Sequence, residues 1–345
     1  MLKKTLIATV LLTCASALAQ ETPVWQTIQP GGDTICSDGT PYSYLEMKAN
    51  PKKLVLEFMG GGACWNDLTC GAGSKTYIPN LTGASSAQLS GGIYDKSNAA
   101  NPVKDWSHVF VPYCTADVHL GNNVKTYQGK TVYHKGAVNA RAVLNDVFQK
   151  YPELDQILVT GCSAGSYGSI MATPYMLRQY PNARVVQLGD AGLGVAPASF
   201  GQVGFANWNA FGAIPDWMEG LAAVRADVSK LTVAGLYNAI GTGYPRALLS
   251  QVTSSTDTTQ IGFYSLMKGI VQPDQKVAVE WMTGALTQLK TLAATTPNFS
   301  AYVYGGQEHC VINRAGFYTT TVGGVKLTDW LSTALNGQKP APVLP

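Results

Sequence analysis

Residues 156–165 read Gln-Ile-Leu-Val-Thr-Gly-Cys-Ser-Ala-Gly and decide the fold class. The apolar run over residues 156–160 is typical of a buried strand, and the residues that follow the serine have the pattern of a helix. Between them, Gly-x-Ser-x-Gly predicts a sharp strand-to-helix turn, because glycines leave room for a strained backbone. We therefore predict that Ser163 is a nucleophile exposed at the carboxyl edge of a sheet. The alternative is a serine that only caps the helix.

Outward from this turn, short β-branched runs alternate with stretches of helical spacing. This alternation predicts an α/β fold with a mostly parallel sheet and helices on both faces, in one catalytic domain over residues 20–345. A proline at position 174 is expected to kink one helix. The expected strands cover residues 53–59, 108–112, 156–160, 184–189, 246–252 and 299–304, and the expected helices cover 136–151, 165–180 and 276–292.

Residues 191–244 show no clear period and are rich in aromatic residues among glycine, alanine and asparagine. One interpretation is a set of ordinary helices with core aromatics. The other is an inserted cap whose aromatic side chains form an apolar substrate surface. On that second interpretation, Phe205, Trp208 and Trp217 are the candidate substrate-binding residues.

The amino-acid composition limits which classes of molecule this protein can have as partners. The chain has 345 residues, 24 Lys and Arg against 21 Asp and Glu, and 13% charged residues, about half the usual share. This near-neutral balance argues against a nucleic-acid partner, which requires a basic surface. After the N-terminal leader, no apolar run reaches the length of a membrane span.

Residues 1–19 have the pattern of a secretory leader, with two lysines, an apolar run over 5–13 and a small-residue cleavage site. We expect cleavage after Ala19 and a secreted or periplasmic protein. A lipoprotein anchor at Cys14 is the alternative. Export leaves an even number of cysteines in an oxidising compartment, which predicts three disulfides.

A serine nucleophile needs a base, and the chain has four histidines. In α/β-hydrolases the chain order is serine, acid, histidine, and only His309 follows Ser163. Several aspartates lie between them. We prefer Asp257 as the acid, because it follows a predicted strand through a Ser/Thr turn, over Asp190, whose strand follows directly on the nucleophile's helix. The other histidines, His108, His119 and His134, are interpreted as structural or surface residues.

The glycine run at 60–62 directly follows a predicted strand, as an oxyanion loop of the HGGG type would, although Met59 replaces its histidine. Consecutive glycines let backbone N–H groups approach a substrate oxygen. We predict that the N–H groups of Gly61, Gly62 and Ala164 form the oxyanion hole. A plain turn is the alternative. No spacing of histidine and cysteine indicates a metal site, and no cofactor is expected.

Several sequence blocks match a family pattern. They are 36–41 (CSDGTP), 56–64 (LEFMGGGAC) with Cys70, 111–117 (VPYCTAD), 161–165 (GCSAG), 190–192 (DAG) and 257–261 (DTTQI). Through these blocks, which are spread over most of the mature chain, the sequence resembles the pectin acetylesterase family, which includes the animal carboxylesterase Notum. The resemblance implies a secreted serine esterase on an α/β-hydrolase-like fold. It also implies a Ser–Asp–His mechanism with Asp257 as the acid and a structural role for Asp190.

The departures from the family pattern lie in the walls of the expected pocket. Ser166 replaces the second glycine after the nucleophile, and Ala63 and Thr259 each replace a tryptophan. These changes bear on the substrate more than on the reaction.

The positions of two cysteines also resemble the tannase and feruloyl esterase group, in which a disulfide joins the neighbour of the serine to the neighbour of the histidine. We therefore predict a disulfide between Cys162 and Cys310, with a buried free thiol at Cys162 as the alternative. The pairs Cys64–Cys70, which are six residues apart, and Cys36–Cys114, which remain and belong to shared blocks, complete the prediction.

The sequence thus predicts a secreted serine carboxylesterase that removes acetyl groups from a polysaccharide such as pectin. The aromatic segment and the low charge are also compatible with a second hypothesis, an esterase for apolar, aromatic or polyester substrates. A hypothesis of a different class is a non-catalytic secreted protein that binds a glycan or a lipid on this fold.

Overall fold

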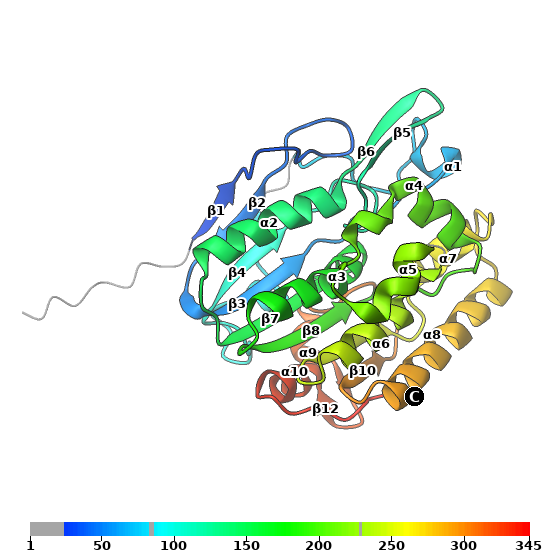
Figure 1. Cartoon of the computed structure of the whole chain (residues 1–345). Coiled ribbons are helices and arrows are strands. Elements are labelled where there is room, and N and C mark those ends of the chain that lie inside the picture. Colours follow the sequence, from blue (N-terminus) through cyan, green and yellow to red (C-terminus); the bar gives the residue numbers. More distant parts are fainter. Residues whose placement is uncertain (1–23, 83–85, 228–229) are drawn as a thin grey trace, which may run out of the picture.

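The computed structural model describes residues 24–82, 86–227 and 230–345, so the predicted leader and Cys14 lie outside the described residues. Within these ranges the centre is an eight-stranded sheet in the order β1-β2-β4-β3-β7-β8-β9-β10 (Figure 1). The strands from β4 to β10 in this order run parallel, and β2 and β1 are added antiparallel at one edge. The prediction of an α/β-hydrolase-like fold is confirmed.

The strands have the following bounds: β1 Trp25–Ile28, β2 Tyr44–Met47, β3 Asn50–Phe58, β4 Trp106–Val111, β5 Asn123–Tyr127, β6 Lys130–His134, β7 Gln156–Cys162, β8 Arg184–Asp190, β9 Leu248–Ser254, β10 Phe299–Tyr304, β11 Thr321–Val322 and β12 Val325–Lys326. The α-helices are α1 Asp67–Cys70, α2 Gly136–Lys150, α3 Ala164–Gln179, α4 Ala206–Trp208, α5 Ala222–Ala226, α6 Val233–Gly243, α7 Thr258–Met267, α8 Gln275–Thr295, α9 Gly316–Thr319 and α10 Leu327–Leu335.

The central strands are buried on both faces because their side chains alternate between two cores. In β10, Phe299 and Val303 pack into the core under α6 and α8, whereas Tyr302 packs into the core under α9 and α10. In β3, Leu56 joins the core under α2 and α3, and Val55 joins the opposite one. The sheet is therefore a middle layer with helices on each side (Figure 1).

Each strand predicted from the sequence forms part of this sheet, and the three predicted helices correspond to α2, α3 and α8. Helix α3 runs through Pro174 without interruption, and the expected kink stays a prediction. The edge strands β1 and β2, the projecting β5–β6 hairpin and helices α7 and α10 were not predicted, because they are short or only partly periodic.

Residues 191–227 and 230–244 lie between β8 and β9 and form a run of short helices. A π turn over Gly201–Phe205 precedes α4, and 3-10 turns over Ala210–Ala213 and Glu219–Leu221 lie between α4 and α5. The aromatic residues Phe200 and Trp208 are buried here. The segment contains buried core aromatics and also lines the main cavity, and its interpretation as a cap that forms a substrate surface stays a prediction.

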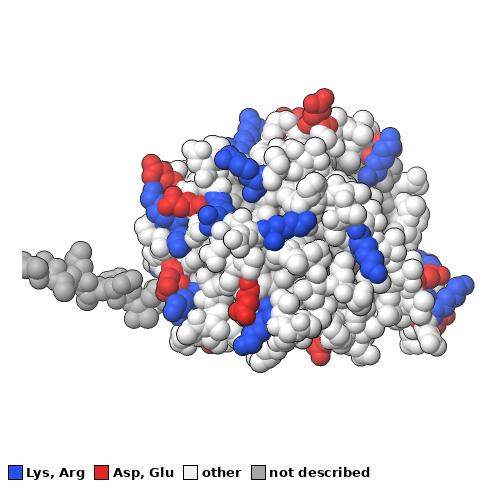
Figure 2. Space-filling view, turned by 90° about the horizontal axis from the view of Figure 1, so that it is seen from below, with Lys and Arg blue, Asp and Glu red and all other residues white. Residues whose placement is uncertain are grey.

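Charged side chains are sparse on the surface. Figure 2 shows single basic and acidic side chains scattered over a mostly uncharged face. Among the described residues, no helix combines the length and the apolar character that a membrane crossing requires.

Candidate active site

Ser163 lies in a strained turn between β7 and α3, with φ +59° and ψ −122°. A non-glycine residue adopts such a backbone only where the surroundings impose it. The flanking glycines explain how the turn fits: a Cβ on Gly165 would lie 1.9 Å from the carbonyl oxygen of Phe58, and one on Gly161 would lie 2.4 Å from the carbonyl oxygen of Gly165. The absent Cβ atoms therefore allow the turn to pack directly against the end of β3.

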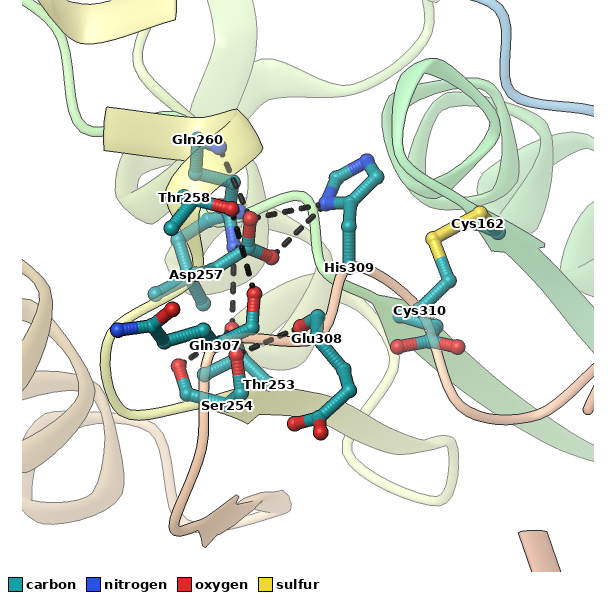
Figure 3. Close-up of polar contacts among 12 residues, drawn as sticks. Cys162, Thr253, Ser254, Asp257, Thr258, Gln260, Gln307, Glu308, His309 and Cys310 are labelled. Atoms are coloured by element: carbon teal, nitrogen blue, oxygen red, sulfur yellow. Dashed lines mark hydrogen bonds and ion pairs between the residues drawn. A yellow bond between two sulfur atoms is a disulfide. The ribbon is translucent and has the colours of Figure 1, made fainter. Parts of the chain in front are cut away.

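His309 and Asp257 come from loops at the ends of β10 and β9 and point toward each other (Figure 3). His309 Nδ1 lies 2.8 Å from Asp257 Oδ2 and 3.0 Å from Oδ1. The Asp257 carboxyl group is fully buried, and the His309 side chain is 19% exposed. Since the carboxylate accepts at Nδ1, the neutral imidazole carries its hydrogen there and keeps a free lone pair on Nε2.

The Asp257 carboxyl group is held from its own helix. Asp257 is the N-cap of α7, and its Oδ1 accepts a hydrogen bond of 2.9 Å from the backbone N–H of Gln260. The Gln260 side chain donates to Asp257 Oδ2 at 3.0 Å and to Thr253 Oγ1 at 3.0 Å. Its Oε1 accepts from the N–H of Leu193 at 3.0 Å. Gln260 thus joins the acid to the segment that lines the cavity.

Asp190 has a different position, at the end of β8, and among the described residues it makes no hydrogen bond to the ring of His309. Its Oδ2 accepts from the N–H groups of Val311 at 2.6 Å and Ile312 at 2.9 Å, and its carbonyl accepts from the N–H of Ser163 at 2.8 Å. Burial raises the pKa of Asp190 to about 6 in spite of these bonds. Asp190 therefore positions the loop that carries His309 beside the serine turn.

A disulfide between Cys162 and Cys310 joins the same two loops next to Ser163 and His309 (Figure 3). Among the described residues, the pairs Cys64–Cys70 and Cys36–Cys114 are also bonded, so the three predicted pairings are confirmed.

Ser163 and His309 line the same cavity. His309 Nε2, the nitrogen that faces away from Asp257, is buried and has no hydrogen-bond partner among the described residues. No hydrogen bond joins it to Ser163 in the described part of the chain. His309 therefore keeps one unpartnered ring nitrogen and lines the same cavity as Ser163.

The glycine loop after β3 lies beside this serine, since a Cβ on Gly60 would meet the Ser163 Cβ at 2.9 Å. Gly62 lines the cavity together with Ala164, whereas Gly61 lines a second hollow next to it. The N–H groups of Gly61, Gly62 and Ala164 donate no hydrogen bond within the described residues. They remain free to bind a substrate oxygen.

Sequence reasoning missed how this loop is held. His119, interpreted as a packed or surface histidine, is buried, and its Nε2 lies 2.9 Å from the carbonyl oxygen of Met59. Its ring packs edge-on against Phe58. Desolvation lowers the pKa of His119 to about 4, so the ring is neutral at pH 7 and donates from Nε2. No local pattern indicates this contact, because 60 residues separate the two partners.

The other two histidines are also buried in structural contacts. His108 Nε2 lies 2.8 Å from Glu57 Oε2 inside the sheet. His134 Nδ1 lies 3.1 Å from the carbonyl oxygen of Thr115. Two clusters of metal-type side chains occur in the described residues, but each contains a disulfide, whose sulfurs cannot act as thiolate ligands.

The cavity beside Ser163 has a volume of about 260 Å³ and is mostly apolar. Of the three aromatic residues proposed as substrate contacts, Phe205 and Trp208 line it. Trp217 does not, because it packs edge-on against Tyr175 under the Arg178 guanidinium. The larger apolar side chains of the lining include Trp65, Val118, Leu120, Tyr167, Val195, Phe200, Phe205, Trp208, Leu231, Val233, Leu236, Phe263, Tyr264, Met267 and Trp281.

Comparison with known proteins points to one family. The profile of the family described as Pectinacetylesterase matches residues 22–201. The palmitoleoyl-protein carboxylesterase NOTUM of Schmidtea mediterranea is 26% identical over 144 residues, covering 39% of this chain and 27% of that protein. Pectin acetylesterase 7 of Arabidopsis thaliana is 25% identical over 170 residues, covering 46% of this chain and 42% of that protein.

A third relative is the inactive palmitoleoyl-protein carboxylesterase notum1b of Danio rerio, which is 30% identical over 146 residues, covering 39% of this chain and 96% of that protein. The match spans less than half the length of the other two relatives.

Proposed function

Since the chain belongs to the pectinacetylesterase family, we propose that it is a carboxylic ester hydrolase with Ser163 as nucleophile, His309 as general base and Asp257 as its partner. One relative is named inactive, so family membership alone does not carry the activity. The observation that carries it is the His309–Asp257 pair, because His309 keeps an unpartnered Nε2 among the described residues and lines the same cavity as Ser163.

In this mechanism the Ser163 hydroxyl group attacks the ester carbonyl carbon while His309 Nε2 takes its proton. The tetrahedral intermediate collapses, the C–O bond to the alcohol breaks, and the alcohol leaves with the proton from His309. A water molecule, deprotonated by His309, then attacks the carbonyl carbon of the acyl-enzyme. The bond from this carbon to Ser163 Oγ breaks, Oγ takes the proton back from His309, and the carboxylic acid product leaves. Asp257 keeps the imidazole in the required tautomer and stabilises the imidazolium.

The negative charge that develops on the carbonyl oxygen needs donors that are in place before the reaction. The N–H groups of Gly62 and Ala164 line the cavity without acceptors among the described residues, and Gly61 follows on the same loop. We assign these three groups to the oxyanion hole, with His119 fixing the loop through the Met59 carbonyl.

The cavity favours an apolar acyl group. Its lining is aliphatic and aromatic, and its volume of about 260 Å³ far exceeds the space that the two carbons of an acetyl group fill. Burial of each methylene of a longer chain contributes about 0.8 kcal/mol. Apolar acyl esters are therefore the substrates that the site supports best. Removal of acetyl groups from pectin or another polysaccharide is the second candidate, and its support is the family match.

Three disulfides in the described residues favour an oxidising compartment, and we place the protein outside the cytoplasm on that basis. Cleavage of a leader after Ala19 and a lipid anchor at Cys14 are distinguished by mass spectrometry of the mature N-terminus.

Hydrolysis of p-nitrophenyl esters from C2 to C12, run beside acetylated pectin, tests the substrate class. We expect kcat/KM to rise with acyl length toward the medium chains.

Ser163→Ala should lower kcat by about 10⁶ with the fold intact. A Ser163→Ala variant that kept more than about a hundredth of wild-type kcat would exclude Ser163 as the nucleophile. Absence of covalent labelling of Ser163 by an organophosphate would favour a non-catalytic lipid- or glycan-binding protein instead.

A further inference from the structure

A second hollow lies next to the main cavity, beside the oxyanion loop at Gly61 and Gly62. It is an open surface groove of about 530 Å³. Gly62, Thr259 and Phe263 line both the groove and the cavity, so the two spaces are adjacent along a shared edge. That edge is made by the oxyanion loop and the first turns of α7.

The groove is lined by apolar side chains even where these side chains are exposed to solvent. Ile78 is 37% exposed and Val271 is 67% exposed, and both line it. Leu266 and Phe263 are half-buried beside them. Among the described residues that line the groove, Lys75 is the one charged side chain. This surface suits an alkyl chain better than a polyanion such as a polyuronate.

We propose that this groove is the subsite for the alcohol half of the ester and that it takes a linear aliphatic alcohol. The inference rests on the proposed function. Three features assign the groove to the alcohol and the cavity to the acyl group. The cavity contains Ser163, to which the acyl group becomes bonded. The leaving oxygen receives its proton from His309, which is held by the N-cap of α7, and α7 forms one wall of the groove.

The third feature is the glycine in that wall. A Cβ on Gly262, in the middle of α7, would meet nothing within 4 Å. A Cβ at position 262 therefore contacts no described residue, and since Gly262 lines the groove, a larger side chain placed there is added at the groove wall. Gly262 also lies outside the triad and the oxyanion loop, which makes it a selective probe.

The experiment holds the acid constant and varies the alcohol. We expect kcat/KM of the wild-type enzyme to rise roughly tenfold from methyl to octyl butanoate, since the alkyl chain is partly buried in the groove. Gly262→Phe should remove most of that rise and leave methyl butanoate within about twofold of wild type. Gly262→Ala, which adds one carbon, should keep the rise.

A second pair of variants tests the groove independently, in case Gly262→Phe does not fold. Val271→Asp should reduce the octyl preference by about three- to tenfold. Val325→Asp, at a 39% exposed valine of β12 outside the groove, should keep it. The circular dichroism spectra of the four variants are compared with that of the wild type.

The proposal is overturned if wild-type kcat/KM is flat from methyl to octyl butanoate while it rises with acyl length. It is also overturned if the groove variants slow both alcohols equally or if Val325→Asp matches Val271→Asp. Failure of the proposed function has a separate signature, because then the wild-type enzyme hydrolyses none of the esters, or Ser163→Ala hydrolyses them equally well.

Discussion

Asp257 and Asp190 follow neighbouring strands of one sheet, yet they contact different atoms. Asp257 binds the side chain of His309. Asp190 instead accepts hydrogen bonds from the backbone N–H groups of Val311 and Ile312, which follow His309 by two and three residues. A carboxylate on Nδ1 acts on the tautomer and charge of the imidazole. A carboxylate on the backbone positions the loop. The two residues should therefore respond differently to the same substitution.

We expect Asp257→Asn to lower kcat by about 10⁴, because the amide presents a donor to Nδ1 and favours the wrong tautomer. Asp190→Asn keeps an oxygen for the N–H groups of Val311 and Ile312 and should retain much more activity. Steady-state kinetics on a p-nitrophenyl ester compare them. If Asp190→Asn were the more damaging change in a folded protein, the assignment of the acid would be wrong.

Gln260 lines the cavity, and its side-chain amide donates to Asp257, so we infer that it acts by positioning the acid. Gln260→Ala removes the side-chain donor to Asp257 Oδ2. We expect kcat to fall by about 10- to 100-fold with little change in KM, since a small misplacement of the triad is costly. Gln288→Ala is the matched control, because that amide donates to the carbonyl oxygen of Leu193 and does not contact Asp257. Equal losses of kcat in both variants would contradict the role.

At the scale of elements, the serine turn depends on the close approach of β3 and α3. A Cβ on Gly165 would lie 1.9 Å from the backbone oxygen of Phe58, and backbone cannot move aside as a side chain can. Gly165→Ala should therefore destabilise the protein by several kcal/mol or prevent folding, on the order of other strong overpacking defects.

Gly262→Ala is the control for that substitution, since it places the same methyl group on a helix where nothing lies within 4 Å. It should stabilise the fold by about 0.5–1 kcal/mol. Chemical denaturation of both variants measures the difference, and a similar loss in both would show that close packing of the turn is not the cause.

The Cys162–Cys310 disulfide joins two elements, the serine turn and the histidine loop, across a sequence separation of 148. Replacing both cysteines by alanine should lower the free energy of unfolding by up to about 5 kcal/mol in the chain-entropy model. It should also lower kcat, because the distance from His309 to Ser163 is no longer constrained.

Cys36–Cys114, with a separation of 78, provides the comparison. Its removal should cost a similar free energy of unfolding, about 4–5 kcal/mol in the same model, and leave kcat of the folded protein nearly unchanged. Equal kcat in both double variants would show that the disulfide next to the triad acts on stability alone.

At the scale of the whole molecule, buried carboxyl groups make stability depend on pH. Burial raises the pKa of Asp190 to about 6, above its ordinary value of 3.8. Between these values the folded state holds a proton that the unfolded state has lost, so stability from this group falls as the pH rises from about 4 to 6. Above both values the loss is complete.

The free energy of unfolding of the wild type, relative to Asp190→Asn, should therefore decrease as the pH rises from 4 to 7. The decrease is at most about 3 kcal/mol, since one pKa unit corresponds to about 1.4 kcal/mol. Urea denaturation at several pH values measures it. A difference that is constant with pH, or one that grows as the pH rises, would contradict the raised pKa.

Features that rest on local rules could be predicted from the amino-acid sequence alone. The strand–turn–helix around Ser163 follows from β-branched residues, glycines and helical spacing within ten positions. His309 follows from chain order, because the other histidines precede the serine. The parallel sheet follows from the alternation of strands and helices, and the close spacing of Cys64 and Cys70 anticipates their bond.

Features that depend on contacts between distant residues could be seen only in the three-dimensional arrangement of the chain. The 2.8 Å contact of His309 with Asp257, the amide of Gln260 between the acid and Leu193, and the His119–Met59 contact join positions whose separation carries no periodic signal. Trp217 packs against Tyr175 instead of lining the cavity, because direction into a cavity depends on how short helices fold back on the sheet. Local sequence patterns indicate which face of a helix or strand is apolar. They do not indicate which other element packs against that face, and this packing sets the shape of the cavity.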